Sequence, residues 1–441
     1  MTGVDMMDGL KELMAENQVV CQDQEHHYLG NSGMVTVYPQ TEDEISNVLK
    51  YANDHGKKIV VASGETKRGY GGHIQYSDIL LSLSKYKGVI EHTVGDMTIT
   101  VKAGTPFQEL QSYLATHNQM IALDARWMEN ATIGGIIAAN DSGPKRLGYG
   151  SARDSVIGMR LVYPDGKIIR SGGKVVKNVA GYDMNKLFIG SMGTLAILSE
   201  ITLKLRPIAK KENVILLTFE DSEFEEIRYF ATSLLDSKLE PISLELLNRS
   251  ISDRLTQQKK HTLAISFEDV ASSVDYQVES IQKMKPKHCG MAILQDNEAT
   301  SFWQGLSRSG PNGILKENQN DTFAALKIGV KNLDVLLAMK KIEALHEIQQ
   351  ISLEAHGGLG HGICSVYLKG SVEEVEEAIL QLRAFIVELG GYVVATHLPF
   401  TLRQRIDVYG DKPAHFFLFE GIKAKVDPNN VLNYKRFVGG L

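Results

Sequence analysis

The sequence predicts an α+β protein built from two domains and a C-terminal segment. Short strand patterns alternate with short helices over the first ~205 residues, and the pattern changes after Pro207. From there, two successive runs follow the order strand, helix, strand, strand, helix, strand. Such units pair into one antiparallel sheet with helices on one face. We therefore expect domains at residues 1–207 and 208–410, with residues 411–441 packing back on the first domain.

Short apolar runs that end at turn residues predict the strands of the first domain. Thr41, with Glu44 three residues later, is a capping box that begins a helix, and Thr105 followed by Pro106 begins another. A hairpin turn is predicted where Asp165 precedes a glycine between two of the strands. The expected strands cover residues 35–39, 58–62, 78–83, 98–103, 156–163, 167–170 and 195–205.

The second domain repeats its pattern of elements without obvious sequence identity between its halves. Ser222, with Glu225 three residues later, is a capping box at its first helix. The expected strands are 214–219, 242–247, 262–267, 291–294, 324–330, 351–355, 363–368 and 392–396. The expected helices are 222–235, 270–284, 333–346 and 372–389, with another in the C-terminal segment at 413–426 before an irregular stretch at 427–430.

Composition indicates a globular protein and excludes several classes of partner. The 441 residues are 43% hydrophobic, and a net charge of -6 without a dense Lys/Arg block argues against a nucleic-acid partner. No apolar stretch approaches the ~18 to 20 residues of a membrane helix, and acids near residue 1 argue against a signal peptide. Cys21, Cys289 and Cys364 form no CxxC pair, so we expect reduced thiols in a cytoplasmic protein without its own iron–sulfur cluster.

The first Gly-rich segment, residues 63–72, follows a predicted strand. It combines glycines, which permit close backbone approach, with a hydroxyl and the cations Lys67 and Arg68. Such a loop can turn several backbone N–H groups onto a phosphate, although a flexible surface loop explains the composition equally well. It is neither GxGxxG opening a helix nor a Walker loop, which argues against NAD and nucleotide triphosphates.

The second Gly-rich segment, residues 131–143, begins with a short helix. Thr132 caps that helix, and Gly134 and Gly135 in its first turn leave space for a flat, bulky ligand. A tightly packed helix is the alternative explanation. Further Gly-rich segments follow at residues 148–154, 177–183 and 190–200.

In this order and spacing, these segments resemble the FAD-binding domain of the vanillyl-alcohol oxidase/PCMH superfamily, of the FAD-linked oxidase type. The resemblance covers residues ~35–207 and the later domain in outline. It implies a PCMH-type FAD-binding domain of two subdomains, followed by a ferredoxin-like-repeat antiparallel sheet domain of the FAD-linked oxidase C-terminal type. Some members attach FAD through a histidine in the first loop. His73 lies beyond that position, so we expect non-covalent FAD.

The resemblance also assigns cofactor-binding residues. The first loop would hold the FAD pyrophosphate through Gly64, Glu65, Thr66, Lys67 and Arg68. The remaining assigned residues are Thr132, Ile133, Gly134, Gly135, Ser142, Gly143, Gly150, Arg153, Asp154, Gly193 and Thr194. Arg153 and Asp154 can also be explained as a structural ion pair.

Four segments, residues 175–183, 406–410, 427–433 and 436–440, resemble the FAD-binding accessory subunit of glycolate oxidase. This implies a complex in which a catalytic flavoprotein subunit oxidises a small 2-hydroxy acid to the 2-oxo acid and an iron–sulfur subunit carries electrons onward. The chain would then be cytoplasmic, or peripheral to the inner membrane through these partners. Two alternatives stay open: a self-sufficient FAD-dependent D-2-hydroxy-acid dehydrogenase, and a non-catalytic structural flavoprotein subunit.

The catalytic motif of such enzymes is broken in this chain. Catalytic members carry HxGDGNxH in the second domain. Aligned on His356, the Asp position is Leu359, the Asn position is His361 and the final His position is Ile363. The candidate catalytic residues are His356 and His361, acting as a displaced pair. Two histidines without a carboxylate make a weak metal site, so no metal is expected. They are equally well explained as polar hairpin residues that face the flavin cleft. Other candidates near the cleft are His397, Arg403 and Arg405.

Overall fold

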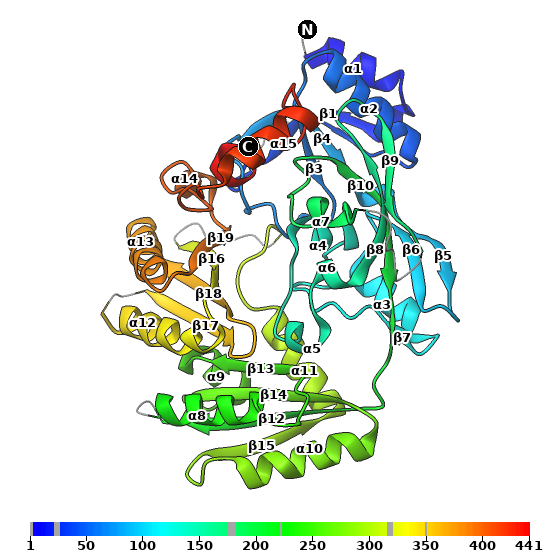
Figure 1. Ribbon diagram of the computed structural model, residues 1–441. Coiled ribbons are helices and arrows are strands. Elements are labelled where there is room, and N and C mark those ends of the chain that lie inside the picture. Colours follow the sequence, from blue (N-terminus) through cyan, green and yellow to red (C-terminus); the bar gives the residue numbers. More distant parts are fainter. Residues whose placement is uncertain (1–2, 22–26, 175–181, 221–222, 315–320, 349–350) are drawn as a thin grey trace.

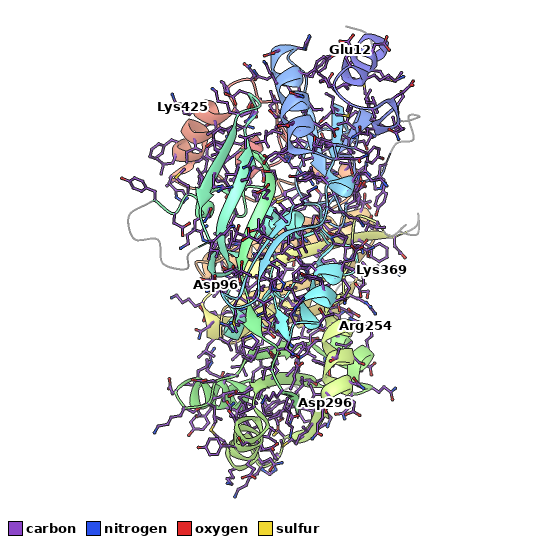
Figure 2. The ribbon with its side chains drawn as sticks, turned by 90° about the vertical axis from the view of Figure 1, so that its right-hand side faces the viewer. Glu12, Asp96, Arg254, Asp296, Lys369 and Lys425 are labelled. Carbon is purple, nitrogen blue, oxygen red and sulfur yellow. The ribbon has the colours of Figure 1, made fainter. Side chains whose placement is uncertain are left out.

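The computed structural model describes residues 3–21, 27–174, 182–220, 223–314, 321–348 and 351–441. Its sheets form two bodies, one holding the N-terminal strands and one holding a single large sheet (Figure 1). In the view turned by 90°, Glu12 and Lys425 lie toward one end of the molecule and Asp296 lies near the other (Figure 2). The molecule is therefore elongated along the direction in which the two bodies stack.

A four-stranded sheet carries the first Gly-rich loop at the end of its edge strand β3. The order is β1-β2-β4-β3, with β2, β4 and β3 parallel and β1 antiparallel. The capping box predicted at Thr41 and Glu44 is confirmed, because the Thr41 hydroxyl accepts a hydrogen bond from Glu44 N at 3.2 Å. The elements are α1 Gly3–Lys11, β1 Val19–Cys21, β2 Ser32–Val37, α2 Glu42–Asp54, β3 Ile59–Ala62 and β4 Tyr76–Ser82.

A five-stranded antiparallel sheet, in the order β5-β6-β10-β8-β9, completes the first body. The predicted hairpin at Asp165 is confirmed by the pairing of β8 with β9. The predicted cap at Thr105 is wrong. Pro106 is in extended conformation and occupies the N-cap, while the Thr105 hydroxyl donates to Lys102 O at 2.6 Å. The strands are β5 Val89–Thr93, β6 Thr98–Lys102, β8 Val156–Val162, β9 Ile168–Gly172 and β10 Ile197–Lys204.

Short helices connect these strands and line the centre of the first body. A two-stranded pair of β7 and β11 lies beside them. The elements are α3 Phe107–Ala115, β7 Gln119–Met120, α4 Ile133–Ala139, α5 Arg146–Tyr149, α6 Ala152–Ser155, α7 Asn185–Phe188 and β11 Arg206–Pro207.

The second body contains one eight-stranded antiparallel sheet, in the order β15-β12-β14-β13-β17-β18-β16-β19. This confirms that the two predicted units join into a single sheet. Their junction is the pairing of β13 with β17, in which Glu245 lies opposite Gly358 and Leu247 opposite His356. The strands are β12 Lys211–Phe219, β13 Ser243–Leu247, β14 His261–Asp269, β15 Gly290–Gln295, β16 Thr322–Gly329, β17 Ser352–Gly358, β18 Ile363–Gly370 and β19 Tyr392–His397.

Helices cover both faces of this sheet, so the expectation of helices on one face is wrong. Ile215 and Leu217 pack against the outer helices, whereas Val214 and Leu216 pack in a separate cluster with residues of α9 and α11. Since both faces of β12 are buried, its sequence is a nearly continuous apolar run. The outer helices are α8 Phe224–Leu235, α10 Ala271–Met284, α12 Val335–Ile348 and α13 Val372–Glu388; the inner ones are α9 Arg249–Thr256 and α11 Asp296–Ser307. Ser222 lies outside the described residues.

The C-terminal segment returns to the first body, where Figure 1 shows α15 near the N-terminal elements. Val431 and Leu432 are fully buried in the core of the first body. Leu432 also forms a parallel bridge with Ile59 of β3. The helices here are α14 Phe400–Arg403 and α15 Phe416–Val426. The domain limits at residues 207 and 410 stay a prediction.

One buried ion pair supports this arrangement. Lys423 of α15 pairs with Asp427 at 2.6 Å and also donates to Thr194 O at 2.8 Å and to Leu432 O at 3.1 Å. Within the described part of the chain, no helix is long and apolar enough to cross a membrane.

Candidate functional site

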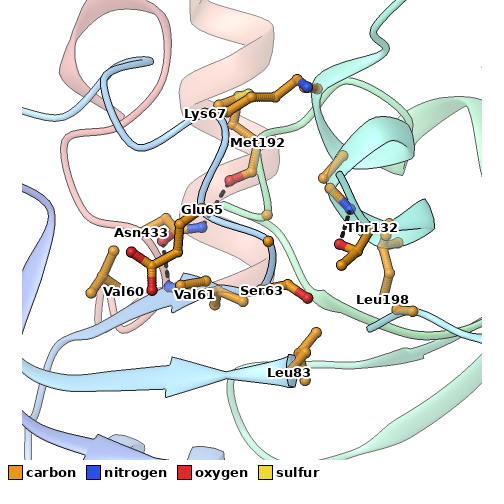
Figure 3. Close-up of a pocket in the computed structure, with 18 of the residues that line it drawn as sticks. Val60, Val61, Ser63, Glu65, Lys67, Leu83, Thr132, Met192, Leu198 and Asn433 are labelled. Atoms are coloured by element: carbon orange, nitrogen blue, oxygen red, sulfur yellow. Dashed lines mark hydrogen bonds between the residues drawn. The ribbon is translucent and has the colours of Figure 1, made fainter. Parts of the chain in front are cut away.

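A large cavity lies in the first body, where the Gly-rich loops meet the C-terminal segment. Its open volume is about 930 Å³, including the space at its mouth, which is the size of a cofactor pocket. Figure 3 shows Ser63 and Glu65 after strand β3, Thr132 across the cavity from them, and Asn433 from the C-terminal segment. The assigned residues that line it are Gly64, Glu65, Thr66, Lys67, Arg68, Thr132, Gly134, Gly135 and Gly193.

The first loop takes a conformation that restricts its residues. A Cβ at Gly64 would lie 1.9 Å from Asn130 O, so only glycine fits there. Glu65 has φ of 54°, a left-handed conformation that is costly for a residue with a side chain. The hydroxyl of Ser63 is buried without a hydrogen-bond partner among the described residues. A strained loop with an unsatisfied polar atom in a cavity wall indicates a ligand-binding segment.

Two buried arginines from the C-terminal part of the chain hold this loop. Arg436 donates to the carbonyls of Val61, Lys67 and Tyr70 at 3.2–3.3 Å. Arg403 donates to the carbonyl of Gly71 and to others nearby. The predicted cleft residue Arg403 therefore bonds to backbone carbonyls of the loop, and no carboxylate among the described residues forms an ion pair with it.

The charges of these arginines are not compensated within the described residues. Burial lowers the pKa of Arg403 to about 9, and that of Arg436 to about 10, with further contributions from nearby arginines. Arg68, in contrast, pairs with Glu65 at 2.8 Å. Because an uncompensated buried cation is costly, this excess positive charge beside the loop favours an anionic ligand.

The two glycines of α4 have different roles. A Cβ at Gly134 would lie 2.7 Å from the carbonyl oxygen of Ala103, so Gly134 permits close packing of α4. At Gly135 an added Cβ would approach only the Thr132 hydroxyl, at 3.3 Å, and Gly135 lines the cavity. Gly135 therefore keeps space open for a ligand. The predicted Thr132 cap is confirmed by a hydrogen bond from Gly135 N at 3.4 Å, whereas Ile133 is buried in the core.

Several assigned residues lie away from this cavity. Ser142 and Gly143 line a smaller cavity near Asp124 and His356. Asp154 accepts hydrogen bonds from Ser151 and caps a short helix.

The other outlying residues make local contacts. Arg153 donates to Lys186 O at 2.9 Å, so no ion pair between Arg153 and Asp154 is formed. The Thr194 hydroxyl donates to Ser191 O at 2.7 Å. Gly150 has φ of 79° at the end of α5, a conformation that favours glycine.

The candidate histidines form a buried cluster with a carboxyl that sequence reasoning missed. His356 Nδ1 lies 2.6 Å from Glu245 Oε1, and His361 Nε2 lies 3.8 Å from Glu245 Oε2. His356 Nε2 also lies 3.2 Å from the hydroxyl of Tyr367. Glu245 lies in the strand Ser243–Leu247, whose residues are all buried. An acidic residue within such an apolar strand is unusual, and this sequence pattern could have identified Glu245 as a candidate.

Burial shifts the titration of this cluster toward neutral forms. Burial raises the pKa of Glu245 to about 8 and lowers the pKa of His356 to about 3. The pair is therefore a neutral hydrogen bond at pH 7, in which the protonated Glu245 carboxyl donates to His356 Nδ1. Neither histidine lines the large cavity, and their catalytic role stays a prediction. Among the described residues, no group of three or more His, Cys, Asp or Glu is arranged to hold a metal ion.

Of the remaining candidates, Arg405 pairs with Glu376 at 2.5 Å. It lines neither the large cavity nor the smaller one beside Ser142 and Gly143. His397 lines a cavity between the two bodies. His73, the residue considered for covalent attachment, does not line the large cavity.

Comparison with known proteins identifies the class of this site. A family model described as "FAD binding domain" matches residues 34–172. A second, described as "FAD linked oxidases, C-terminal domain", matches residues 208–435, which is more than half of the chain. Among solved structures, 4-ethylphenol oxidase from Gulosibacter chungangensis aligns with a TM-score of 0.75 at 15% identity, covering 98% of this chain and 96% of that chain. This similarity supports the fold.

Curated relatives include subunits and dehydrogenases. Glycolate oxidase subunit GlcD of Bacillus subtilis (strain 168) is 27% identical over 419 residues, covering 90% of this chain and 87% of that protein. The mitochondrial D-lactate dehydrogenase [cytochrome] of Arabidopsis thaliana is 28% identical over 457 residues, covering 97% of this chain and 79% of that protein. Glycolate oxidase subunit GlcE of Escherichia coli (strain K12) is 38% identical over 152 residues, covering 34% of this chain and 43% of that protein.

Proposed function

Because this chain belongs to the FAD-linked oxidases, we propose that it is the FAD-binding subunit of a glycolate-oxidase-type complex that oxidises a 2-hydroxy acid to a 2-oxo acid. The chain is an FAD-dependent oxidoreductase, and its relatives GlcD and D-lactate dehydrogenase are named for 2-hydroxy acids. FAD supplies a two-electron acceptor for the hydride of the hydroxy acid.

The observation that carries the proposal is the large cavity, with Arg436 in its wall and Arg403 bonded to carbonyls of the first loop. Arg403 and Arg436 provide two uncompensated cations beside the first loop, which matches the two negative charges of a pyrophosphate. Gly64 allows the loop to pass Asn130, and Gly135 leaves room for a flat ring. The residues present therefore fit FAD: the first loop would hold the pyrophosphate, and α4 would border the isoalloxazine.

The proposal includes an iron–sulfur partner subunit, because electrons that reach FAD need an acceptor. Cys21 is exposed while Cys289 and Cys364 are buried, and all three are free thiols. Cys21 lies in β1 of one sheet and Cys364 in β18 of another, while Cys289 directly precedes β15, so the three described thiols are not placed to ligate one iron–sulfur cluster together. Electrons that leave FAD would therefore pass to a cluster on a separate subunit.

A second candidate function is a self-sufficient dehydrogenase. The similarity to GlcD and to D-lactate dehydrogenase extends over 90% and 97% of this chain, which includes the second domain. A cavity between the two bodies adjoins the FAD cavity and offers space for a substrate. The similarity to GlcE, which favours the accessory role, covers 34% of the chain.

Anaerobic reduction tests the two roles. The purified chain is mixed with glycolate or D-lactate, and bleaching of the flavin absorbance is followed with and without an added catalytic subunit. We expect bleaching only when that subunit is present. Bleaching by the chain alone would support the self-sufficient enzyme instead. A bound flavin that is never bleached under either condition would contradict both and support the non-catalytic role.

A further inference from the structure

Helix α15 of the C-terminal segment presents apolar side chains to solvent. Phe417 and Leu418 are 65% and 51% exposed, whereas Phe416 and Lys423 of the same helix are buried. Gly421 lies one turn after the exposed pair, and a Cβ added there would meet nothing within 4 Å. Because residues three and four apart lie on the same side of a helix, Phe417, Leu418 and Gly421 form one uncovered face.

Lysines lie at both ends of this uncovered face. Lys412 precedes the helix, and its Nζ lies 4.4 Å from the centre of the Phe416 ring. Lys425 lies in the last turn and is exposed, seven and eight residues after Leu418 and Phe417, so helix periodicity places it on their side. Figure 2 shows Lys425 at the edge of the molecule.

Two further lysines meet at Tyr434, just beyond the C-terminal end of α15. The Nζ atoms of Lys58 and Lys435 lie 5.2 and 5.3 Å from the centre of the Tyr434 ring. Lys58 also donates to the carbonyl of Asn429, three residues after the helix ends, at 2.6 Å. The first body thus contributes a cation to the surface around α15.

The positive charge of this surface is not neutralised nearby. None of the four lysines forms an ion pair with a carboxylate among the residues that the structure describes. The acidic residues of the stretch 411–426 are Asp411 and Glu420. A chain with a net charge of -6 therefore carries a local excess of positive charge around the uncovered face of α15.

Apolar space is also left unfilled behind the helix. A cavity with an open volume of about 640 Å³, including the space at its mouth, lies between α15 and α7. Phe419 and Ile422 of α15 contribute to its wall, together with Leu187 of α7 and Phe437. A cavity of this size and lining has room for a lipid acyl chain.

We propose that α15 docks this protein on an anionic lipid surface. Interfacial helices combine Phe and Leu with lysines, and anionic headgroups attract each lysine near the surface. Protein–protein interfaces, in contrast, are depleted in lysine, so a lipid surface fits this face better than a protein partner does. The inference goes beyond the proposed function, because it assigns a membrane contact to this chain itself and not to a partner subunit.

Cosedimentation of the purified full chain with lipid vesicles tests the proposal. At low salt, vesicles of phosphatidylglycerol mixed with phosphatidylcholine should sediment the protein. Phosphatidylcholine alone, or high salt, should leave most of it in solution. Lys412→Gln combined with Lys425→Gln should lower the partition coefficient about tenfold to thirtyfold, because two attracted charges are lost. Phe417→Ser combined with Leu418→Ser should lower it about tenfold or more.

Matched control variants change the same kinds of side chain in the second body. Leu380→Ser combined with Val387→Ser alters two exposed apolar residues of α13. Lys259→Gln combined with Lys331→Gln removes two exposed lysines. Both control proteins should bind the vesicles as the wild-type chain does, and circular dichroism checks that every variant is folded.

Three results would overturn the proposal. The first is a wild-type chain that does not sediment with the anionic vesicles. The second is wild-type binding by a folded α15 variant, which would leave the uncovered face to a protein partner. The third is an equal loss of binding in the control variants, which would show attraction without a defined surface. Because sedimentation requires neither bound flavin nor turnover, its failure is distinct from a failure of the proposed function.

Discussion

Arg403 illustrates how single residues link distant parts of the chain. It is fully buried, and its guanidinium donates to carbonyls near Leu29 and Gly71, more than 300 residues away in sequence. The sequence marked Arg403 only as a candidate residue near the cleft. Its actual partners are backbone carbonyls, and no local pattern reports a contact over such a distance. Arg436 was missed for the same reason.

Replacing Arg403 should weaken cofactor binding. Arg403→Met removes the bonds that hold the first loop and one of its two uncompensated charges, so we expect FAD affinity to fall about tenfold to a hundredfold. Fluorescence titration of the apoprotein with FAD measures this. Arg405→Met, which removes an ion pair with Glu376 away from the cavity, is the matched control. Equal FAD affinity in the two variants would refute the role given to Arg403.

Glu245 gives a pH dependence of stability. Its pKa in the folded state, about 8, lies above the unfolded value near 4.3, so the folded state binds more protons between these values. This stabilisation is complete below the unfolded pKa and is lost as pH rises through 8. His356, with its pKa of about 3, acts in the opposite direction but only below about pH 6.5.

Between pH 6.5 and 8 the Glu245 effect therefore acts alone within this pair. We expect the free energy of unfolding to fall by about 1–2 kcal/mol over this interval relative to Glu245→Gln, as measured by urea denaturation. A constant difference between the two proteins across the interval would show that Glu245 does not titrate there.

At the scale of elements, the sequence predicted those with strong local signals. The α2 capping box and the hairpin at Asp165 depend on residues close in sequence, and both are present. Helices α9 and α11 were missed because they cover the inner face of the sheet, and the continuous apolar run of β12 does not reveal which face is covered. The incorrect Thr105 cap has a similar origin, since Pro106 is compatible with either position.

Helix α4 offers a test of cavity shape. Gly135→Leu places a bulky side chain where only the Thr132 hydroxyl is near, so the protein should fold but lose FAD. Gly421→Leu in α15, where an added Cβ meets nothing within 4 Å, is the matched control and should retain FAD. Circular dichroism checks folding and absorbance checks flavin content. Normal FAD binding by a folded Gly135→Leu protein would place the ring elsewhere.

At the scale of the whole molecule, the cofactor cavity depends on parts of the chain that are far apart in sequence. Asn433 donates to Met192 O at 2.8 Å and accepts from Val61 N at 2.9 Å, which ties the C-terminal segment to two walls of the cavity. The Gly-rich segments of the first domain were recognisable from local composition. The contributions of the second domain and the C-terminal segment were not, because they arise only when the chain folds back on itself.

The visible absorption spectrum of the purified chain tests whether the large cavity binds FAD. We expect a flavin spectrum before denaturation, and after denaturation and filtration we expect free FAD in the filtrate with no flavin left on the protein. A folded, pure chain that shows no flavin absorbance, even after incubation with excess FAD, would contradict the assignment of the large cavity to this cofactor.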